Sequence, residues 1–268
     1  MRIGFLGAGN MASAMIRGLR AKGLSPADVA AFDVCADKVA ALSADCGLTV
    51  ADSAADLIAR SDVVVLAVKP QMLKEALADL QPALAAADPL IVSIAAGTPL
   101  QTLETLCGDG RRIVRVMPNL NATVGEAMSA FCGNARVTEP DLQTAETVLC
   151  AFGKAVRLPE DQFSAYSALA GCSPAYSMLY MDALVRAGVE AGIDEDTAKA
   201  VVAQAVLGTA KLLAASPDSP ETWIERVCSP GGTTIEGVKV LRTEKVSDAV
   251  KAAAFASIRR DEELAKAH

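Results

Sequence analysis

The chain has 268 residues, of which 52% are hydrophobic and only 4% aromatic, with a single tryptophan, Trp223. This length predicts two domains or one large one, and the apolar content excludes a disordered chain. The 25 basic and 32 acidic residues give a net charge of −7 with no basic run, which argues against a nucleic-acid or anionic-membrane partner.

The cysteines and the histidine restrict the chemistry further. Seven scattered cysteines without a C-x-x-C pair are typical of reduced, mostly buried thiols in a cytosolic protein. We expect no signal peptide and no membrane span, since the most apolar stretch, 200–215, is interrupted by Gln204 and Lys211. The only histidine is His268, so an interior imidazole base and nearly every zinc site are excluded, and we expect no metal centre.

The first dozen residues, MRIGFLGAGNMA, organise the rest of the chain. A short apolar run leads to Gly7-Ala8-Gly9, and apolar residues then recur at helical spacing from Asn10. Strand, glycine turn and helix in the pattern G-x-G-x-x-A predict a dinucleotide site in which Gly7 permits the turn and Gly9 admits a pyrophosphate. The N–H groups at the helix start, at Asn10 and Met11, would bind it. An ordinary strand-to-helix turn can also carry two glycines.

Asp33 lies 24 residues after Gly9, close to the spacing expected for the acidic residue that binds the ribose hydroxyls. An aspartate there favours NAD over NADP. A solvated aspartate that opens the next loop is the alternative, and Lys38 in the same loop could serve a phosphate. The choice between NADH and NADPH stays open.

Strands and helices alternate through the first part of the chain. Strands are expected at 28–34, 48–50, 62–68, 90–94 and 112–117, and helices at 36–46, 53–60, 72–86 (interrupted or ended at Pro82) and 100–107. Two further edge strands, 127–131 and 155–158, flank a helix over 139–152. The alternation predicts an α/β fold, a doubly wound parallel sheet that forms a Rossmann-type domain over residues 1–158.

Ligands of such sheets bind beyond the carboxyl ends of the strands. Lys69-Pro70 and Pro118-Asn119 each follow a strand, and small residues end another at Ala95-Ala96-Gly97. The predicted cofactor-binding residues at these strand ends are Ala67, Val68, Lys69, Pro70, Ala95 and Asn119.

The chain from 159 to 268 contains only helical patterns. They cover 162–169, 175–191, 194–215, 220–227, 233–241 and 247–264. Their apolar content exceeds what exposed helix faces need, which favours packing against a second copy of the chain. A self-contained helical bundle is the alternative.

One segment of this helical half, Cys228-Ser229-Pro230-Gly231-Gly232-Thr233-Thr234, differs from its surroundings. Pro-Gly-Gly predicts a tight turn that leaves the N–H groups of the following helix free. With three hydroxyls close by, the turn is suited to a carboxylate, although a simple helix cap would use some of the same residues.

A second turn, Ala170-Gly171-Cys172-Ser173-Pro174, opens a long helix. A thiol at a helix start can have a lowered pKa, but Cys172 has no histidine to pair with and is not expected to be a nucleophile.

The chain resembles the pyrroline-5-carboxylate reductase family over its whole length. The resemblance rests on GFLGAGNMASAMIRGL, AVKPQ, VSIAAG, RIVRVMPN, AGCSPAY and, most specifically, CSPGGTTIEG. It implies NADPH- or NADH-dependent reduction of L-1-pyrroline-5-carboxylate to L-proline in the cytoplasm. It also implies a helical dimerisation domain, a homodimer or an oligomer of dimers, and a site between the nicotinamide and the SPGGTT loop.

The resemblance also implies roles for single residues. Ser229, Gly231, Gly232, Thr233, Thr234 and Ser173 would bind the substrate, with Ser229 and Thr234 as catalytic residues and Thr234 bonded to the ring nitrogen. The sequence departs from the family pattern at Ala170, Cys172, Leu120, Asn121 and Asp33. The first four affect the shape of the substrate pocket, and the last affects the choice of cofactor.

Reduction of a C=N bond needs a hydride donor, a hold on the carboxylate and one proton, which fits a chain without an interior histidine. The enzymatic alternatives are a reductase of another cyclic imino acid and a β-hydroxyacid dehydrogenase, although Lys199 and Lys211 lack the glycine-containing context that the latter needs. The non-enzymatic alternative is a dinucleotide-sensing scaffold, which would not need a second anion site.

Overall fold

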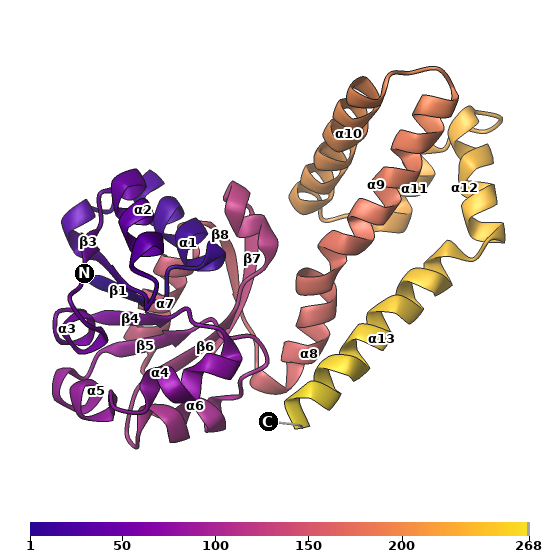
Figure 1. Ribbon diagram of the computed structural model, residues 1–268. Coiled ribbons are helices and arrows are strands. Elements are labelled where there is room, and N and C mark those ends of the chain that lie inside the picture. The colour runs from indigo at the N-terminus through magenta and orange to yellow at the C-terminus, as the bar shows by residue number, and fades with distance from the viewer. Residues whose placement is uncertain (267–268) are drawn as a thin grey trace. The chain divides into compact units, whose positions relative to one another are not determined.

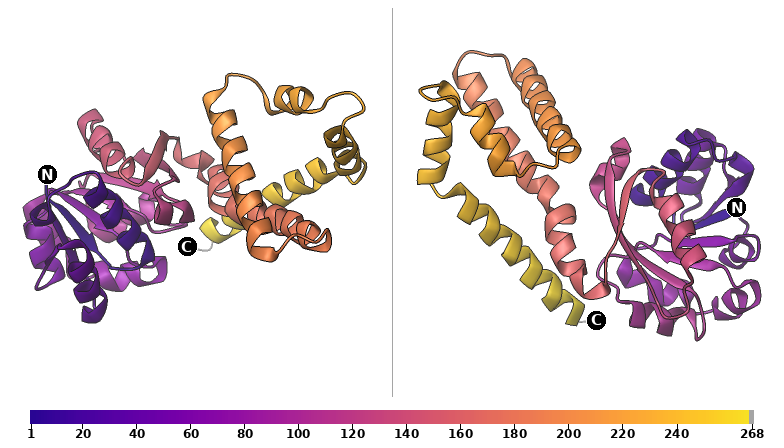
Figure 2. Two further views of the ribbon diagram at one scale, coloured as in Figure 1. Left: turned by 90° about the horizontal axis from the view of Figure 1, so that it is seen from above. Right: turned by 180° about the vertical axis from the view of Figure 1, so that it is seen from behind.

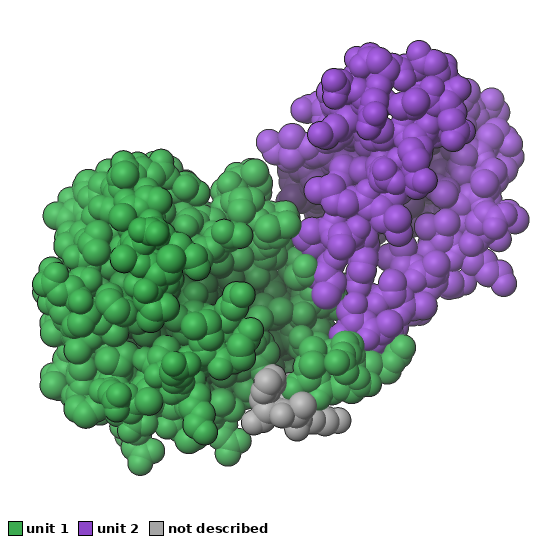
Figure 3. Space-filling view, in the orientation of Figure 1, with its two compact units in different colours: residues 1–171, 258–268 green, residues 172–257 purple. Residues whose placement is uncertain are grey.

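The computed structural model describes residues 1–266, which form two compact units (Figure 1, Figure 3). Unit 1 contains Met1–Gly171 and the end of the last helix from Ile258, and unit 2 contains Cys172–Ser257. His268 lies outside the described residues.

Unit 1 therefore extends beyond the predicted domain limit at residue 158. Phe163 and Tyr166 are buried in a small apolar cluster with Ala130 and Cys132 of the sheet. This packing attaches the segment after the last strand to unit 1.

Unit 1 is built on one eight-stranded sheet with the order β3-β2-β1-β4-β5-β6-β7-β8. Its strands are β1 Ile3–Leu6, β2 Val29–Phe32, β3 Thr49–Val50, β4 Val63–Leu66, β5 Leu90–Ser93, β6 Ile113–Met117, β7 Ala127–Gly133 and β8 Gly153–Arg157. The first six pair in parallel, as expected for a doubly wound sheet.

The prediction for β7 was wrong in one respect, because β7 is an interior strand between β6 and β8. It also runs antiparallel to β6, and β8 then runs parallel to β7. Only residues 118–126 separate β6 from β7, and a parallel return needs a crossover of about a dozen residues or more. The short connection therefore forces the reversal.

Helices cover both faces of the sheet (Figure 2). One face packs against α1 (Asn10–Ala21), α2 (Ala36–Cys46) and α7 (Glu139–Leu149), and the other against α3 (Ala54–Ala59), α4 (Leu73–Leu77), α5 (Gln81–Ala87) and α6 (Leu100–Cys107). Successive strand residues alternate between these two cores, as Phe5 and Leu6 do. Strands β1, β4 and β5, in the middle of the parallel part of the sheet, are thus buried on both sides.

The helix expected over 72–86 is divided in two. α4 ends at Leu77, α5 begins at Gln81, and Pro82 lies in the first turn of α5. Proline lacks the N–H that a helix interior requires but is tolerated in a first turn. The break therefore precedes Pro82.

Unit 2 is helical. The short helix α8 (Phe163–Tyr166) and a π-helical turn (Ser167–Cys172) lead to α9 (Ser173–Glu190), α10 (Glu195–Ala215), α11 (Pro220–Val227), α12 (Thr233–Thr243) and α13 (Val246–Lys266). α9 and α10 pack closely, since a Cβ on Gly188 would lie 3.3 Å from that of Ala198. The Tyr176 hydroxyl is hydrogen-bonded to Ser257 of α13.

The apolar side chains of unit 2 are mostly exposed. Among its described residues, Ala198 is the one hydrophobic side chain that is fully buried. The large exposed ones on α9 to α13 include Met178, Leu179, Tyr180, Val201, Leu207, Leu212, Val227, Val240 and Phe255.

α10 is long and apolar enough to cross a membrane by length and composition alone, and only 6% of it is buried within the chain. The core helix of a soluble protein meets the same criterion, so this is weak evidence for a span. The sequence predicts no membrane span over 200–215, because Gln204 and Lys211 interrupt this apolar stretch.

All seven cysteines are free, but they are not mostly buried as expected. Cys107 and Cys132 are buried, Cys150 is exposed, and the other four are half-buried. Burial raises the pKa of the Cys107 thiol to about 12, so that this side chain behaves as a small apolar residue.

Candidate active site

The glycine turn between β1 and α1 has the geometry of a nucleotide cradle. Gly7 has φ +108°, and a Cβ there would lie 2.8 Å from the backbone of Ala67, directly after the neighbouring strand β4. Only glycine fits this close contact. Ala12 is buried, as the helix-on-strand packing of the motif requires.

Gly9 differs from Gly7, because a Cβ on Gly9 would meet no atom within 4 Å. The residue lies at the N-cap of α1, and within the described part of the chain no side chain caps this helix. Open space therefore lies before the N–H groups of Asn10 and Met11, where the helix dipole favours an anion. These residues fit the pyrophosphate of a dinucleotide.

Asp33 follows β2 and reaches the glycine turn. Its Oδ2 accepts a hydrogen bond from the N–H of Ala8 at 2.8 Å, and its Oδ1 accepts one from the N–H of Cys35 at 2.9 Å. The carboxylate is therefore fixed beside the glycine turn, which is the position predicted for a ribose contact.

The parallel pairing of β1, β4, β5 and β6 brings their carboxyl ends to one edge of the sheet. Ala67, Val68 and Pro70 at the end of β4 are half-buried, and Lys69 is exposed. The methyl group of Ala95 is buried in the apolar core, so that only its backbone can face a ligand.

Asn119 follows β6, and both the nitrogen and the oxygen of its side-chain amide form hydrogen bonds within unit 1. Its Nδ2 donates to the carbonyl of Ala170 at 2.9 Å, and its Oδ1 accepts from the N–H of Met128 at 3.2 Å. The side chain thus ties the strand end to the π-helical turn. Its contact with a cofactor stays a prediction.

The turn between α11 and α12 has the predicted tight geometry. Gly231 has φ +70°, the N–H of Gly232 donates to the carbonyl of Ser229 at 3.0 Å, and Gly232 is the N-cap of α12. A Cβ on Gly232 would lie 2.5 Å from the Ser229 hydroxyl. The left-handed backbone at Gly231 therefore favours glycine, and a side chain at Gly232 would displace the Ser229 hydroxyl.

Ser229, Thr233 and Thr234 are exposed around this helix start, and no described side chain caps α12. The N–H groups of the first turn and three hydroxyls thus lie within one short segment at the start of α12. This arrangement can bind a carboxylate through charge-assisted hydrogen bonds.

Thr234 also lines a cavity of about 410 Å³ within unit 2, together with Tyr180, Thr209, Trp223 and Cys228. The Nε1 of Trp223 is buried and has no hydrogen-bond partner among the described residues. Tyr180 and Trp223 carry no signal in the sequence, because their approach to Thr234 depends on the packing of α9, α11 and α12. Ser173, at the start of α9, does not line the described cavity.

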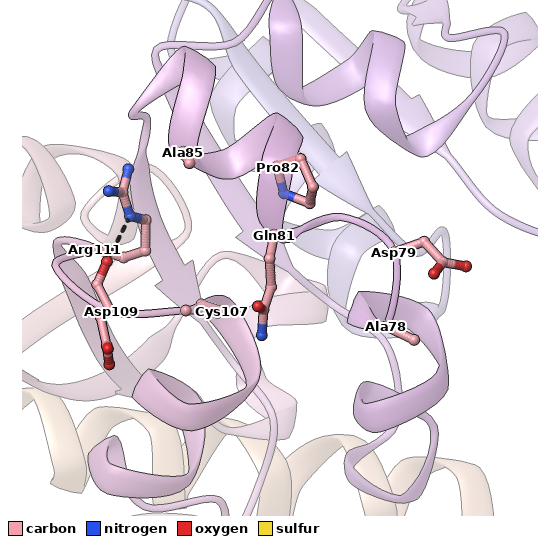
Figure 4. A pocket seen from close by; sticks show the side chains of 9 residues that line it. Ala78, Asp79, Gln81, Pro82, Ala85, Cys107, Asp109 and Arg111 are labelled. Atoms are coloured by element: carbon pink, nitrogen blue, oxygen red, sulfur yellow. Dashed lines mark hydrogen bonds between the residues drawn. The ribbon is translucent and has the colours of Figure 1, made fainter.

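A further cavity of about 540 Å³ lies near α4, α5 and α6 (Figure 4). Its lining residues at 78–85 and 107–111 precede β5 and β6, which places it at the amino ends of the strands. Arg111 there donates to the carbonyl of Asp109. This cavity is therefore separate from the edge that carries the glycine turn.

Comparison with known proteins identifies the chain. Residues 160–264 match the family described as pyrroline-5-carboxylate reductase dimerisation, and residues 2–97 match that described as NADP oxidoreductase coenzyme F420-dependent. A pyrroline-5-carboxylate reductase of Pseudomonas aeruginosa is 39% identical over 99% of this chain and 97% of its own. The chain belongs to the pyrroline-5-carboxylate reductase family.

Solved structures agree with this assignment. A pyrroline-5-carboxylate reductase from Coxiella burnetii has a TM-score of 0.93 and 32% identity, and 98% of each chain is covered. A pyrroline carboxylate reductase from Plasmodium falciparum, solved with NADP bound, has a TM-score of 0.87 and 26% identity over 99% of this chain and 98% of its own. The resemblance, the fold class and the two-part architecture predicted from sequence are confirmed.

The dimerisation match covers α9 to α13, whose apolar faces are exposed in the single chain. Both observations indicate that this member of the pyrroline-5-carboxylate reductase family self-associates through its helical part.

Proposed function

We propose that this chain reduces L-1-pyrroline-5-carboxylate to L-proline with NADPH or NADH. The observation that carries the proposal is the exposed, uncapped start of α12, with its glycine turn and three hydroxyls, in a chain related to these reductases over its full length. A nucleotide-binding fold alone would not need this second anion site.

On the nucleotide side, the open space at Gly9 and the free start of α1 would hold the pyrophosphate. The strand ends from Ala67 to Pro70 would face the rest of the cofactor, as ligands of parallel sheets do. When bound, the nicotinamide would supply the hydride for the C=N bond.

On the substrate side, Ser229 and Thr233 would hold the carboxylate together with the N–H groups that begin α12. Thr234 would hydrogen-bond the ring nitrogen through its hydroxyl, and Gly231 and Gly232 would keep the turn narrow enough for all three groups. Ser173 would complete the substrate contacts from the start of α9.

The reaction balances without a strong base. A hydride from the bound nicotinamide would form the new C–H bond at the imine carbon with its own electron pair. The π pair of C=N would move to the nitrogen, which carries the one proton. Because the imine can arrive protonated, the Thr234 hydroxyl needs only to orient that N–H. Catalysis then consists mainly of holding the two reactants in place.

The test follows nicotinamide absorbance while the purified full-length protein receives pyrroline-5-carboxylate with NADH or NADPH. The expected result is rapid oxidation, together with a much lower rate for 1-pyrroline, which lacks the carboxylate. No oxidation with either cofactor would contradict the proposal. Equal rates for 1-pyrroline would contradict the role of the α12 loop.

We also propose that the protein acts in the cytoplasm as a homodimer, with dimers able to associate further. The apolar surface of α10 would then be covered by a second copy instead of by lipid, in line with the dimerisation match over the same residues. Size-exclusion chromatography with light scattering, without detergent, tests this: soluble dimers or multiples of dimers support it, whereas protein found only in the membrane fraction contradicts it.

A further inference from the structure

We infer that Asp33 makes this chain prefer NADH over NADPH. The inference rests on the proposed function, because it names which of the two nucleotides the same site takes. It concerns the end of the site that receives the adenosine ribose, where the two cofactors differ by one phosphate group.

The carboxylate of Asp33 is held in place on both oxygens. Oδ2 accepts from Ala8 at 2.8 Å, and Oδ1 accepts from Cys35 at 2.9 Å. Ala8 is the central residue of the glycine turn, so the negative charge lies one residue from the predicted pyrophosphate cradle at Gly9. Since two backbone donors already bind it, the side chain has little reason to rotate away.

This position is where the ribose of a dinucleotide passes in the Rossmann arrangement. A carboxylate with free lone pairs can accept hydrogen bonds from both ribose hydroxyls of NADH. It repels the 2′-phosphate of NADPH, which carries close to two negative charges at neutral pH.

The rest of the loop offers few groups that bind a phosphate. Val34 is 83% exposed at the end of β2. The side chains of Val34, Cys35 and Ala36 contain neither a hydroxyl nor a guanidinium group. Asp37 adds a second carboxylate in the first turn of α2, where it complements the helix dipole.

Lys38 is the only cation in the sequence from 33 to 38, and it is exposed. A flexible ammonium group beside two carboxylates is a weak substitute for the arginine or hydroxyl groups that recognise a 2′-phosphate. The NADP-bound relative is 26% identical to this chain, so most residues differ between the two proteins. The cofactor of that relative therefore does not determine which cofactor this loop binds.

The test is isothermal titration calorimetry of the full-length protein with NADH and NADPH, repeated with ADP-ribose and 2′-phospho-ADP-ribose. The second pair lacks nicotinamide and cannot turn over, so it isolates the ribose end. We expect the nucleotide without the 2′-phosphate to bind at least about tenfold more tightly in each pair, equivalent to ~1.4 kcal/mol.

Two variants locate the cause. Asp33→Ser removes the charge and supplies a hydroxyl, and it should bring the ratio of the two dissociation constants close to one or invert it. Asp37→Asn removes an equal charge from the first turn of α2, at a side chain without a described hydrogen bond to the glycine turn, and it should leave the ratio within about threefold. Thermal unfolding checks that both variants are folded.

Equal or tighter binding of the 2′-phosphorylated nucleotides by the unmodified protein would overturn the inference, whatever the variants do. An equal effect of Asp37→Asn and Asp33→Ser would overturn the specific role of Asp33. Failure of the folded protein to bind any of the four nucleotides would overturn the proposed function instead.

Discussion

The two units of this protein use their apolar residues in different ways. In unit 1, both faces of the sheet are covered by helices of the same chain, and residues such as Phe5 and Val64 are 0% exposed. In unit 2, Leu179 is 70% and Met178 is 63% exposed. A helical pattern in the sequence therefore indicates that one face of the helix is apolar. It does not indicate whether the same chain or a second copy covers that face.

The difference has an energetic consequence. Burying one leucine side chain contributes roughly 2 kcal/mol, so the exposed residues of α9 to α13 represent a large stabilisation that a single chain does not obtain. If a second copy covers them, the stability of unit 2 depends on protein concentration, whereas that of unit 1 does not.

The largest expected effect comes from the core of unit 1. Phe131→Ala removes a ring that is 1% exposed, which should destabilise the protein by about 3–5 kcal/mol. Urea unfolding followed by circular dichroism at two protein concentrations measures it, and the loss should be the same at both.

Phe255→Ala is the matched control, because this phenylalanine of α13 is 51% exposed. Its cost should be smaller and should depend on protein concentration. If both substitutions cost the same at every concentration, the distinction between the two units is wrong.

A charge on the apolar surface of unit 2 should act on association. Leu207 on α10 is 44% exposed, and Leu207→Asp should weaken self-association by about thirtyfold or more, or ~2 kcal/mol. Analytical ultracentrifugation over a dilution series gives the dissociation constant.

The control for this charge is Val50→Asp in unit 1, where Val50 is 50% exposed on the edge strand β3. It places the same charge at a similar exposure and should leave association unchanged. Equal weakening by both variants would show that the effect is not specific to the helical surface.

The two units should also divide the work of the reaction. Thr234→Ala removes a hydroxyl proposed to contact the imine nitrogen, so kcat should fall about tenfold to a hundredfold, the loss of one such hydrogen bond. Nucleotide affinity, measured by calorimetry, should stay constant. A parallel loss of nucleotide affinity would refute this role of Thr234.

Gly9→Ala should give the converse result. Its methyl group meets no protein atom within 4 Å and enters the space before α1, so nucleotide binding should weaken by about tenfold with little change in melting temperature. Gly7→Ala is the contrast, because its methyl group would collide with Ala67 and should lower the melting temperature itself.

Local features of the sequence predicted most of the fold. The β-branched run at 62–68 contains β4, and the glycine turn and the α11–α12 turn have the expected geometry, because each depends on residues close together in the chain. The reversal of β7 depends instead on the length of the connection after β6, which apolar periodicity does not report.

Contacts between distant residues were not predictable. The bond from Asn119 to the carbonyl of Ala170 spans 51 residues, and the ion pair of Arg115 with Glu160 spans 45. The approach of Trp223 to Thr234 needs α11 and α12 in place around one cavity. Such contacts arise from tertiary packing, so the spacing of residues in the sequence does not predict them.

The smallest expected effect concerns two buried polar groups without a partner among the described residues, the hydroxyl of Ser129 and the Nε1 of Trp223. Ser129 lies on the interior strand β7 and is 0% exposed, so no ligand or second copy can reach it. Ser129→Ala should therefore stabilise the protein slightly, by up to about 1 kcal/mol, seen as a higher urea midpoint.

Trp223 differs, because its indole lines a cavity of unit 2 that a ligand or a second copy can enter. Trp223→Phe removes the donor and should bring no comparable gain in urea midpoint at protein concentrations where the chain is associated. A gain equal to that of Ser129→Ala would mean that the indole finds no acceptor there either. The buried polar groups of the two units would then behave alike, although the apolar residues differ in exposure between the units.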